Sequence, residues 1–167
     1  MIRIFDFLFS LIGLIILLPL LILIFFIGLF DSGSPLFIQS RVGYNLKSFS
    51  LIKFRTMPLG IRSAGTHLIK NIKFSLFGNF LRRTKIDEIP QLLNVLFGDM
   101  SLVGPRPCLL NQKKLINERK KRGVYKVRPG ITGLAAINGI DMKTPTLLAK
   151  TDQKMIKSMS LYNYFYY

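Results

Sequence analysis

Cysteine is almost absent from this sequence, which contains only Cys108. No disulfide can form within the chain, and nothing in its cysteine content points to an oxidising compartment. Histidine is equally scarce, because His67 stands alone, and a lone histidine is more typical of a surface or a helix start than of a metal site. No internal repeat or low-complexity tract is present either. We therefore expect one modest folded domain, with its basic part in the cytosol.

Acidic side chains are also few. The sequence has eight Asp and Glu against 24 Lys and Arg, which gives a formal net charge of +16. Arg3 and Asp6 cancel each other, so the excess positive charge lies entirely beyond residue 30. A domain of this kind attracts phosphate, whether in nucleic acid, in anionic lipid headgroups or in a polyphosphate substrate. Charge alone does not choose among these partners.

Charged side chains are missing altogether from residues 7–30 (FLFSLIGLIILLPLLILIFFIGLF). This run exceeds the roughly 20 residues that a helix needs to cross a bilayer, so we expect a membrane segment. A cleaved secretory signal is disfavoured, because its apolar region would be shorter and would be followed by small residues. The chain thus divides into a membrane segment, residues 1–30, and a cytosolic domain, residues 31–167.

Pro19 lies near the middle of the apolar run and leaves two arrangements open. Proline removes a backbone hydrogen bond, so it can bend the helix until both ends return to the same membrane face. Proline is also tolerated in helices that span the bilayer. Basic residues prefer the cytosol, and they flank the run at Arg3 and throughout the following domain. Only a re-entrant helix, broken at Pro19, satisfies both preferences.

Two stretches after the apolar run predict a β-hairpin. Residues 35–43 and 46–57 have strand-like composition and flank a Gly-Tyr-Asn turn. Lys53 and Arg55 alternate with an apolar residue and would share one face of the second strand. Such a face could bind phosphate, or it could simply be solvated.

Helical periodicity recurs in three places. Residues 67–81 predict a basic amphipathic helix, suited either to the membrane interface or to an ordinary core. A second helix follows Asp87 and is closed by Gly98, and residues 113–122 predict a short charged helix. We therefore expect an α+β fold: a re-entrant membrane helix, a β-hairpin, and a small, mostly helical cytosolic domain with interfacial amphipathic helices.

Two of the few acids, Asp87 and Glu88, are adjacent within the basic stretch LRRTKIDEIPQ. Pro90 must lie in the first helical turn, which places Asp87 at or next to the N-cap. The helix dipole and the nearby Arg82 and Arg83 should hold this carboxylate ionised. An ionised, partly desolvated carboxylate can act as a nucleophile or bind magnesium. Plain helix capping would also account for an aspartate at this position.

Two arginines in proline- and glycine-rich segments could complete a phosphate site. Arg106 lies between prolines in VGPRP, and Arg128 precedes a Gly-rich turn in RPGITG, while GDMS supplies a further acid, Asp99. Rigid arginine suits bidentate phosphate recognition, although Pro-Arg-Pro could be only a structured loop. Phosphoryl chemistry fits better than glycoside hydrolysis, because adjacent acids cannot flank a sugar from opposite sides. A nucleic-acid surface would interleave cations with aromatic side chains, which is not seen.

Together, QSRVG, KFRTM, LRRTKIDEIPQLLNVLFGDMSLVGPRP and RPGITG resemble the bacterial sugar transferase family, in its short form of monotopic polyprenyl-phosphate phosphoglycosyl transferases. The resemblance runs from the membrane segment to about Gly139. It implies an enzyme that transfers a phosphosugar from a UDP-sugar to polyprenyl (undecaprenyl) phosphate and releases UMP. Such enzymes carry out the first membrane step of capsule, O-antigen, exopolysaccharide or glycoprotein glycan assembly. The implied location is the bacterial cytoplasmic (inner) membrane, with the catalytic domain on its cytosolic face and Pro19 making the helix re-entrant.

The resemblance also implies individual roles. Asp87 is the expected nucleophile, which forms a covalent aspartyl-phosphosugar and contacts Mg²⁺, and Glu88 supports geometry and proton handling. Arg82 and Arg106 match positions associated with the phosphate site. From their charge and position we add three further candidates for binding substrate phosphate: Arg128, Lys53 and Arg55.

Some features depart from the family pattern or leave alternatives open. Ala136 and Ile140 stand where the family often has other residues, so sugar recognition is left open. The aromatic SLYNYFYY resembles the start of a further helix, or a segment resting at the membrane interface. Expected partners are a UDP-sugar, polyprenyl phosphate and membrane lipids, without nucleic acid, and a homodimer is left open. The competing functions are a membrane-anchored basic adaptor without catalysis, which binds phosphate or nucleic acid, and a glycosyltransferase that moves only the sugar.

Overall fold

The computed structural model describes residues 2–59 and 74–167. Its first element is helix α1 (Ile2–Ser32), which ends just beyond the predicted limit of the membrane segment at residue 30. The helix is long and apolar enough to cross a membrane, judged by length and composition. Most of its large apolar side chains are exposed rather than packed against the protein. A long apolar helix at this place was predicted and is confirmed.

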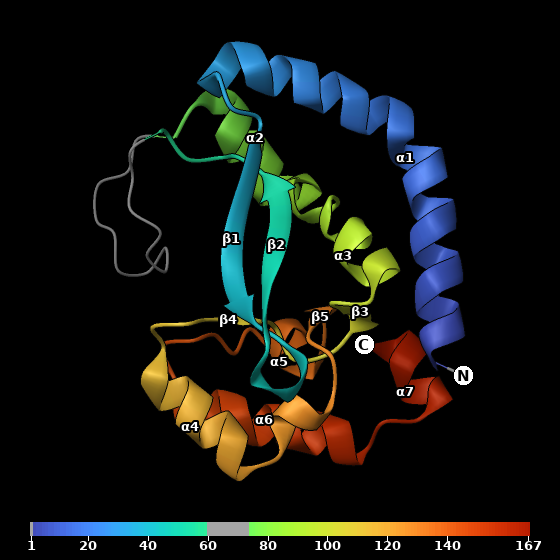
Figure 1. Cartoon of the computed structure of the whole chain (residues 1–167), viewed down its shortest axis with the longest axis vertical. Coiled ribbons are helices and arrows are strands. Elements are labelled where there is room, and N and C mark those ends of the chain that lie inside the picture. Colours follow the sequence, from blue (N-terminus) through green and yellow to red (C-terminus); the bar gives the residue numbers. More distant parts are fainter. Residues whose placement is uncertain (1, 60–73) are drawn as a thin grey trace.

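Helix α1 passes through Pro19 without interruption, and the helix as a whole is bent (Figure 1). The helix is continuous through Pro19, so the predicted break is corrected to a bend. Figure 1 shows α1, in blue, curving around one side of the rest of the molecule. Proline explains such a bend because it lacks the N–H that would bond to the preceding turn, and because its ring pushes that turn away.

The predicted hairpin is confirmed. Strands β1 (Leu36–Val42) and β2 (Ser48–Phe54) pair antiparallel, and the short strand β4 (Cys108–Leu109) adds to the other edge of β1. The connection includes a 3₁₀ turn, η1 (Tyr44–Leu46), in which Asn45 has a φ of 51°. Asparagine tolerates this left-handed conformation better than most residues, which explains the tight reversal.

The next described helix begins later than predicted. Of the predicted helix over residues 67–81, residues 67–73 lie outside the described residues, and Phe74 and Ser75 are not helical. Helix α2 runs over Leu76–Thr84, because the Ser75 hydroxyl accepts a hydrogen bond from the N–H of Gly78 at 2.9 Å and so caps the helix start.

A 3₁₀ turn, η3 (Ile86–Glu88), then leads into helix α3 (Gln91–Phe97). Helix α3 ends at Gly98, whose φ of 94° is the left-handed conformation that glycine adopts without cost. The predicted helix after Asp87, closed by Gly98, is confirmed.

A second sheet joins two segments that are far apart in the sequence. Strand β3 (Ser101–Val103) pairs in parallel with β5 (Gly130–Thr132). The RPGITG segment is therefore part of a strand, not only the predicted tight turn. Its Gly130 is required by close backbone approach, because a Cβ built there would lie 2.0 Å from the backbone N of Gly104.

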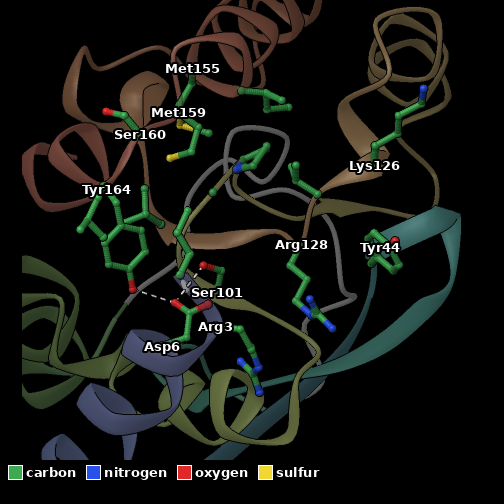
Figure 2. A pocket seen from close by; sticks show the side chains of 17 residues that line it. Arg3, Asp6, Tyr44, Ser101, Lys126, Arg128, Met155, Met159, Ser160 and Tyr164 are labelled. Atoms are coloured by element: carbon green, nitrogen blue, oxygen red, sulfur yellow. Dashed lines mark hydrogen bonds between the residues drawn. The ribbon is translucent and has the colours of Figure 1, made fainter.

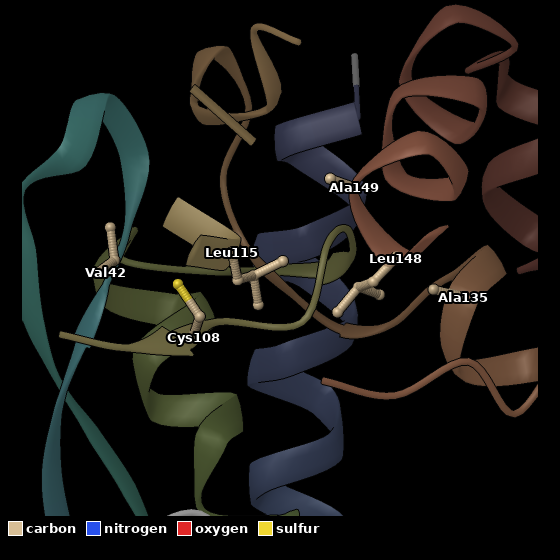
Figure 3. Close-up of a cluster of buried hydrophobic side chains, with 6 residues drawn as sticks. All are labelled: Val42, Cys108, Leu115, Ala135, Leu148 and Ala149. Atoms are coloured by element: carbon tan, nitrogen blue, oxygen red, sulfur yellow. The ribbon is translucent and has the colours of Figure 1, made fainter. Parts of the chain in front are cut away.

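The carboxyl-terminal part is mainly helical. Helix α4 (Lys113–Lys121) confirms the predicted charged helix, and α7 (Leu161–Tyr166) confirms the expected helix in the aromatic end. Helix α6 (Pro145–Lys157) was not predicted. The remaining short elements are η4 (Val124–Lys126) and α5 (Leu134–Ile137). One buried apolar cluster joins helices α4, α5 and α6 to strands β1 and β4 (Figure 3). It contains Val42, Cys108, Leu115, Ala135, Leu148 and Ala149.

Helix α1 packs against this domain at both of its ends. Near its start, the Arg3 guanidinium donates to the carbonyl of Leu96 at 3.0 Å, and Asp6 accepts from the N–H of Leu102 at 2.9 Å. At its other end, Asp31 accepts from the Ser75 hydroxyl at 2.8 Å. The two ends of the apolar helix are therefore fixed to the same folded unit.

Candidate functional site

Asp87 lies in the turn η3, where the backbone bends between α2 and α3. The bend is set by Lys85, whose φ of 61° ends α2 in the left-handed conformation. Asp87 is only 5% exposed, and its carboxylate accepts no hydrogen bond from any residue in the described parts of the chain. The N-cap position of α3 is Pro90, so Asp87 is not the capping residue. Plain capping therefore does not account for a buried carboxylate here.

Glu88 is held quite differently from its neighbour. Its two carboxylate oxygens accept hydrogen bonds from the two terminal nitrogens of Arg106, one of them at 3.4 Å, and the groups form an ion pair. This is the forked arrangement in which arginine binds carboxylate and phosphate. Arg106 thus pairs with Glu88, whereas the Asp87 carboxylate has no hydrogen-bond partner among residues 2–59 and 74–167.

The environment moves the two acids in opposite directions. Burial raises the pKa of Asp87. Of the cations that oppose this shift, Lys53 has the largest effect, but it does not cancel the effect of burial. Burial also acts to raise the pKa of Glu88, but the charge and hydrogen bond of Arg106 outweigh it and lower that pKa. The sequence predicts that neighbouring cations dominate the ionisation of Asp87. In the structure burial has the larger effect on its pKa and raises it. An under-solvated carboxylate is a strengthened nucleophile whenever it is ionised.

Of the two hairpin cations predicted to bind phosphate, Lys53 is the one whose charge acts on Asp87 and Glu88. Burial lowers the pKa of Lys53, and the charge of Asp87 opposes that shift. Its ammonium and the Arg55 guanidinium lie over the ring of Phe37, at 5.5 Å and 5.4 Å from its centroid, so the two cations share one face as predicted. Arg55, however, donates to the carbonyls of Ser34 and Leu36 at 2.8 Å and 3.1 Å, which ties the hairpin to the end of α1.

The other predicted residues separate into two groups. Arg82 stacks on the ring of Phe74 at 4.6 Å and is one of the cations that act on Asp87. Arg128 instead donates to the Gly98 carbonyl at 2.7 Å and lines a cavity whose lining contains neither acid of the pair (Figure 2). Asp99 is near Asn94 rather than the pair. The structure therefore groups Lys53, Arg82 and Arg106 with the acids and places Arg128 elsewhere.

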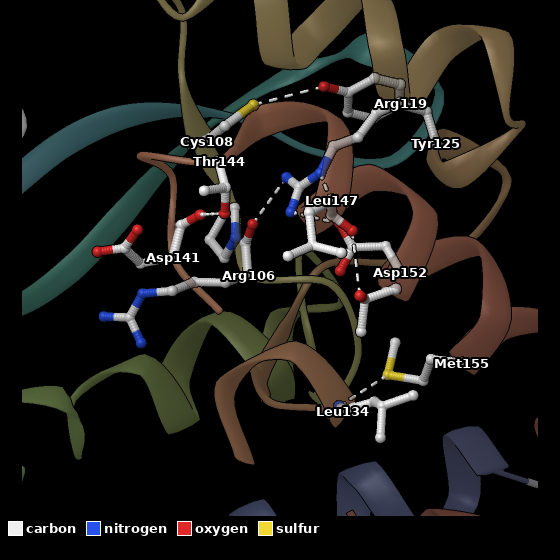
Figure 4. Close-up of polar contacts among 12 residues, drawn as sticks. Arg106, Cys108, Arg119, Tyr125, Leu134, Asp141, Thr144, Leu147, Asp152 and Met155 are labelled. Carbon is white, nitrogen blue, oxygen red and sulfur yellow. Dashed lines mark hydrogen bonds and ion pairs between the residues drawn. The ribbon is translucent and has the colours of Figure 1, made fainter. Parts of the chain in front are cut away.

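Two arginines not singled out from the sequence, the buried Arg119 and the half-buried Arg41, hold the Pro-Arg-Pro loop. Arg119 donates to the carbonyl of Arg106 at 2.8 Å and forms a buried ion pair with Asp152 at 2.8 Å (Figure 4). Arg41 donates to the carbonyl of Pro107 at 3.3 Å. Burial, followed by the charge of Arg106, lowers the pKa of Arg41 to about 10. The motif QSRVG was the only sequence signal for Arg41, and the pairing of Arg119 with Asp152 has no local signal.

Arg119→Met is expected to lower the free energy of unfolding by roughly 3–5 kcal/mol, because it leaves the buried Asp152 charge without a partner. Urea denaturation of the full chain in detergent micelles measures this. Lys121→Met, on the same helix but 73% exposed at its side chain, is the matched control and should cost at most about 1 kcal/mol. The double variant Arg119→Met with Asp152→Asn should recover part of the loss. Equal effects at Arg119 and Lys121 would contradict a buried pair.

The acids also fit a magnesium ion. No group of three or more His, Cys, Asp or Glu side chains is found in residues 2–59 and 74–167, so a fully protein-built metal cage is absent there. Magnesium is usually held by one or two carboxylates together with substrate phosphates. Because Glu88 is paired with Arg106, Asp87 is the carboxylate of the pair that could hold such an ion.

Comparison with known proteins decides the family. The model of the family described as bacterial sugar transferase matches residues 1–166. The chain belongs to the bacterial sugar transferase family. The family expected from the motifs is thereby confirmed, and the Asp87–Glu88 pair, the Pro-Arg-Pro loop and the apolar helix all lie within the matched residues.

Individual sugar transferases resemble the chain over much of its length. An uncharacterized sugar transferase, EpsL, of Bacillus subtilis is 49% identical over 108 residues, covering 64% of this chain and 53% of that protein. The exopolysaccharide production protein PSS of Rhizobium leguminosarum is 39% identical over 149 residues, covering 83% and 74%. A UDP-glucose:undecaprenyl-phosphate glucose-1-phosphate transferase of Xanthomonas campestris is 41% identical over 132 residues, covering 75% and 26%. The chain thus spans about half of the first relative and a quarter of the last.

Proposed function

We propose that this chain transfers a sugar 1-phosphate from a UDP-sugar to polyprenyl phosphate, giving a polyprenyl-diphosphate-sugar and UMP. The acceptor is proposed as undecaprenyl phosphate, by analogy with the named Xanthomonas relative. The product is the first lipid-linked intermediate of an exopolysaccharide, capsule or related glycan. The observation that carries the proposal is the asymmetric acid pair: Asp87 is buried and has no hydrogen-bond partner in the described part of the chain, while Arg106 pairs with Glu88.

The proposed reaction has two displacements at one phosphorus atom. A carboxylate oxygen of Asp87 attacks the phosphorus that carries the sugar, the bond from that phosphorus to the UMP oxygen breaks, and UMP leaves with the electron pair. An oxygen of polyprenyl phosphate then attacks the same phosphorus, and the bond to Asp87 breaks. The split lets the soluble product leave before the membrane-bound acceptor arrives, so the two bulky anionic substrates need not be present together.

The surrounding residues have distinct proposed roles. Arg106 is 45% exposed at its side chain, so its fork can reach substrate phosphate as well as Glu88. Lys53 and Arg82 add positive charge beside Asp87, where negative charge develops on the transferred phosphoryl group. Mg²⁺, when bound, would neutralise the diphosphate charge, and Asp87 is the residue proposed to hold it.

The products distinguish this function from its competitors. The full chain is incubated with UDP-sugars, Mg²⁺ and undecaprenyl phosphate, and the released nucleotide is identified by chromatography. We expect UMP, because the phosphate nearest the sugar is transferred with it. Release of UDP would mean that only the sugar moves, and release of neither nucleotide would favour an adaptor without catalysis; both results contradict the proposal.

The contacts of α1 support a re-entrant membrane helix, with the domain on the cytosolic face of the bacterial cytoplasmic membrane. At about 1.5 Å per residue, α1 is roughly 46 Å long, more than the ~30 Å hydrocarbon core. Arg3 and Asp31, near its two ends, hydrogen-bond to one folded domain. A spanning helix would leave its ends on opposite sides, and a domain fixed to both would have to cross the bilayer. The bend at Pro19 removes this conflict.

Cysteine labelling tests the topology. Arg3→Cys and Lys47→Cys are each expected to react with a membrane-impermeant maleimide in inside-out vesicles and not in intact cells, because both positions face the cytosol. Lys47 is exposed in the hairpin connection and reports the side of the domain. The unsubstituted chain is the control, since its one cysteine, Cys108, is fully buried. Labelling of position 3 only from outside the cell would overturn the re-entrant arrangement.

A further inference from the structure

A cavity separate from the acid pair lies beside the first turn of α1. It has a volume of about 570 Å³, within the range of small-molecule sites, and is bounded by α1, β3, the segment 126–128, α6 and α7. One part of its lining is apolar and includes Met155, Ile156 and Met159, from α6 and the residues that follow it. Another part carries Arg3 and Arg128 (Figure 2).

Arg3 and Arg128 converge on the carboxyl-terminal end of α3. Arg3 donates to the carbonyls of Leu96 and Met100 at 3.0 Å and 3.4 Å, and Arg128 donates to the Gly98 carbonyl at 2.7 Å. These backbone carbonyls fix both guanidinium groups and carry the partial negative charge of a helix end. They leave several N–H donors of each arginine without a protein acceptor among the described residues.

Neither arginine is neutralised by a carboxylate in the parts of the chain that the structure describes. The one acid in the cavity lining, Asp6, is already engaged. Its Oδ1 accepts from the Ser101 hydroxyl at 2.9 Å, from the Leu102 N–H at 2.9 Å and from the Tyr164 hydroxyl at 2.8 Å. The lining carries Arg3, Arg128 and Lys126 against the single carboxylate of Asp6, so its net charge is positive, and the planar forks of the two arginines suit phosphate.

The cavity also lies beside the start of the apolar run of α1. The Phe165 ring, on α7, packs against Phe5 and Phe9 of α1, with centroids 5.6 Å and 6.1 Å apart. Phe9 belongs to the charge-free apolar run, so α7 packs against the start of the proposed membrane segment. Tyr162 and Tyr166 on α7 are 79% and 66% exposed, as aromatic side chains at a membrane interface often are.

From these observations we infer that the cavity binds the phosphate group of an anionic lipid between Arg3 and Arg128, with the start of the lipid's apolar chain against Met155, Ile156 and Met159. Basic pockets beside membrane helices on the cytosolic side are suited to such headgroups. Two sources share this chemistry: a bilayer phospholipid such as phosphatidylglycerol, and the polyprenyl phosphate acceptor. The inference rests on the membrane placement proposed above but not on the proposed catalysis.

Native mass spectrometry of the full chain in detergent tests the site, with phosphatidylglycerol, phosphatidylcholine, undecaprenyl phosphate or inorganic phosphate added separately. We expect phosphatidylglycerol to be retained over phosphatidylcholine by about tenfold or more, as a charge-assisted arginine–phosphate contact would give. The double variant Arg3→Gln with Arg128→Gln should lose this preference. The control, Lys47→Gln with Lys150→Gln, removes two exposed charges outside the cavity lining and should keep it.

The outcomes separate the sources and keep the inference open to refutation. Competition between undecaprenyl phosphate and phosphatidylglycerol would support the site and identify the acceptor as an occupant; absence of competition would support a bilayer phospholipid. Equal retention of inorganic phosphate, or an unchanged preference in the double arginine variant, would overturn the inference. If that variant is unstable, the rise in its own melting temperature on adding phosphatidylglycerol is compared with the control's, and an equal rise also overturns it. Failure to release UMP with lipid selectivity intact would contradict only the proposed function.

Discussion

Asp87→Asn is expected to lower UMP release by a factor on the order of 10⁴ or more, the scale seen when a catalytic nucleophile is removed. The amide has nearly the same shape as the carboxylate but cannot form the aspartyl-phosphosugar. The loss should appear even without acceptor lipid, because UMP leaves in the first step. The measurement is a UMP-release assay with UDP-sugar and Mg²⁺, in the presence and absence of undecaprenyl phosphate.

The same variant should fold at least as stably as the natural chain. Burial raises the pKa of Asp87, so the charged form is disfavoured by folding, and the Asp87 carboxylate accepts no hydrogen bond from a described residue. Removing that charge should leave the melting temperature equal or higher. Glu118→Gln, at an acid of α4 that pairs with Arg122, is the control and should keep UMP release within about twofold, because neither residue is among the charges that act on Asp87 or Glu88. Substantial UMP release from Asp87→Asn would remove Asp87 from the nucleophile's role.

Arg106→Ala is expected to lower kcat/KM by a factor of about 10²–10³, because it removes a fixed cation from developing phosphate charge and frees Glu88. The loop should keep its shape, since Arg119 and Arg41 hold its backbone carbonyls rather than the lost side chain. Arg106→Lys should rescue poorly, because an ammonium cannot reproduce the planar fork. Steady-state kinetics with varied UDP-sugar measures both variants.

Arg83→Ala provides the matched comparison for Arg106→Ala. Arg83 is an exposed arginine on α2, a few residues before the acid pair. Its removal lowers the charge of the protein by the same amount and should change kcat/KM by only a few fold, as expected of a screened surface charge. Near-normal turnover in Arg106→Ala, or an equal loss at Arg83, would reduce Arg106 to a structural loop residue.

Local sequence signals were enough to predict much of the fold. The hairpin, the helix closed by Gly98 and the charged helix at 113–121 follow from alternation, periodicity and end residues, which act over a few neighbours. The candidate acids were also found locally, because two adjacent carboxylates in a strongly basic stretch are unusual. Pro19 is the local signal for a bend in α1. The sequence does not show that the helix stays continuous through this residue.

Features that depend on distant partners were missed or placed wrongly. The parallel pairing of β3 with β5 joins segments whose sequences contain no sign of each other, so the sequence predicts only a turn at RPGITG. Arg119 and Asp152 stand 33 positions apart and meet only in the folded chain. Arg128, like Arg106, lies next to proline, yet in the folded chain it lines the cavity beside α1, whereas Arg106 pairs with Glu88. Helix α6 had a usable signal, since Pro145 at its start and the buried Leu148 and Met155 follow helical rules.

Intact-protein mass spectrometry tests the central claim most directly. The chain is incubated with UDP-sugar and Mg²⁺ without acceptor, quenched in acid and mapped by peptide. We expect a mass increase of one phosphosugar group on Asp87, which disappears when polyprenyl phosphate is added; Glu88→Gln should form the adduct more slowly, and Asp87→Asn should form none. An adduct on Glu88, or no adduct together with kinetics that require both substrates at once, would contradict the account.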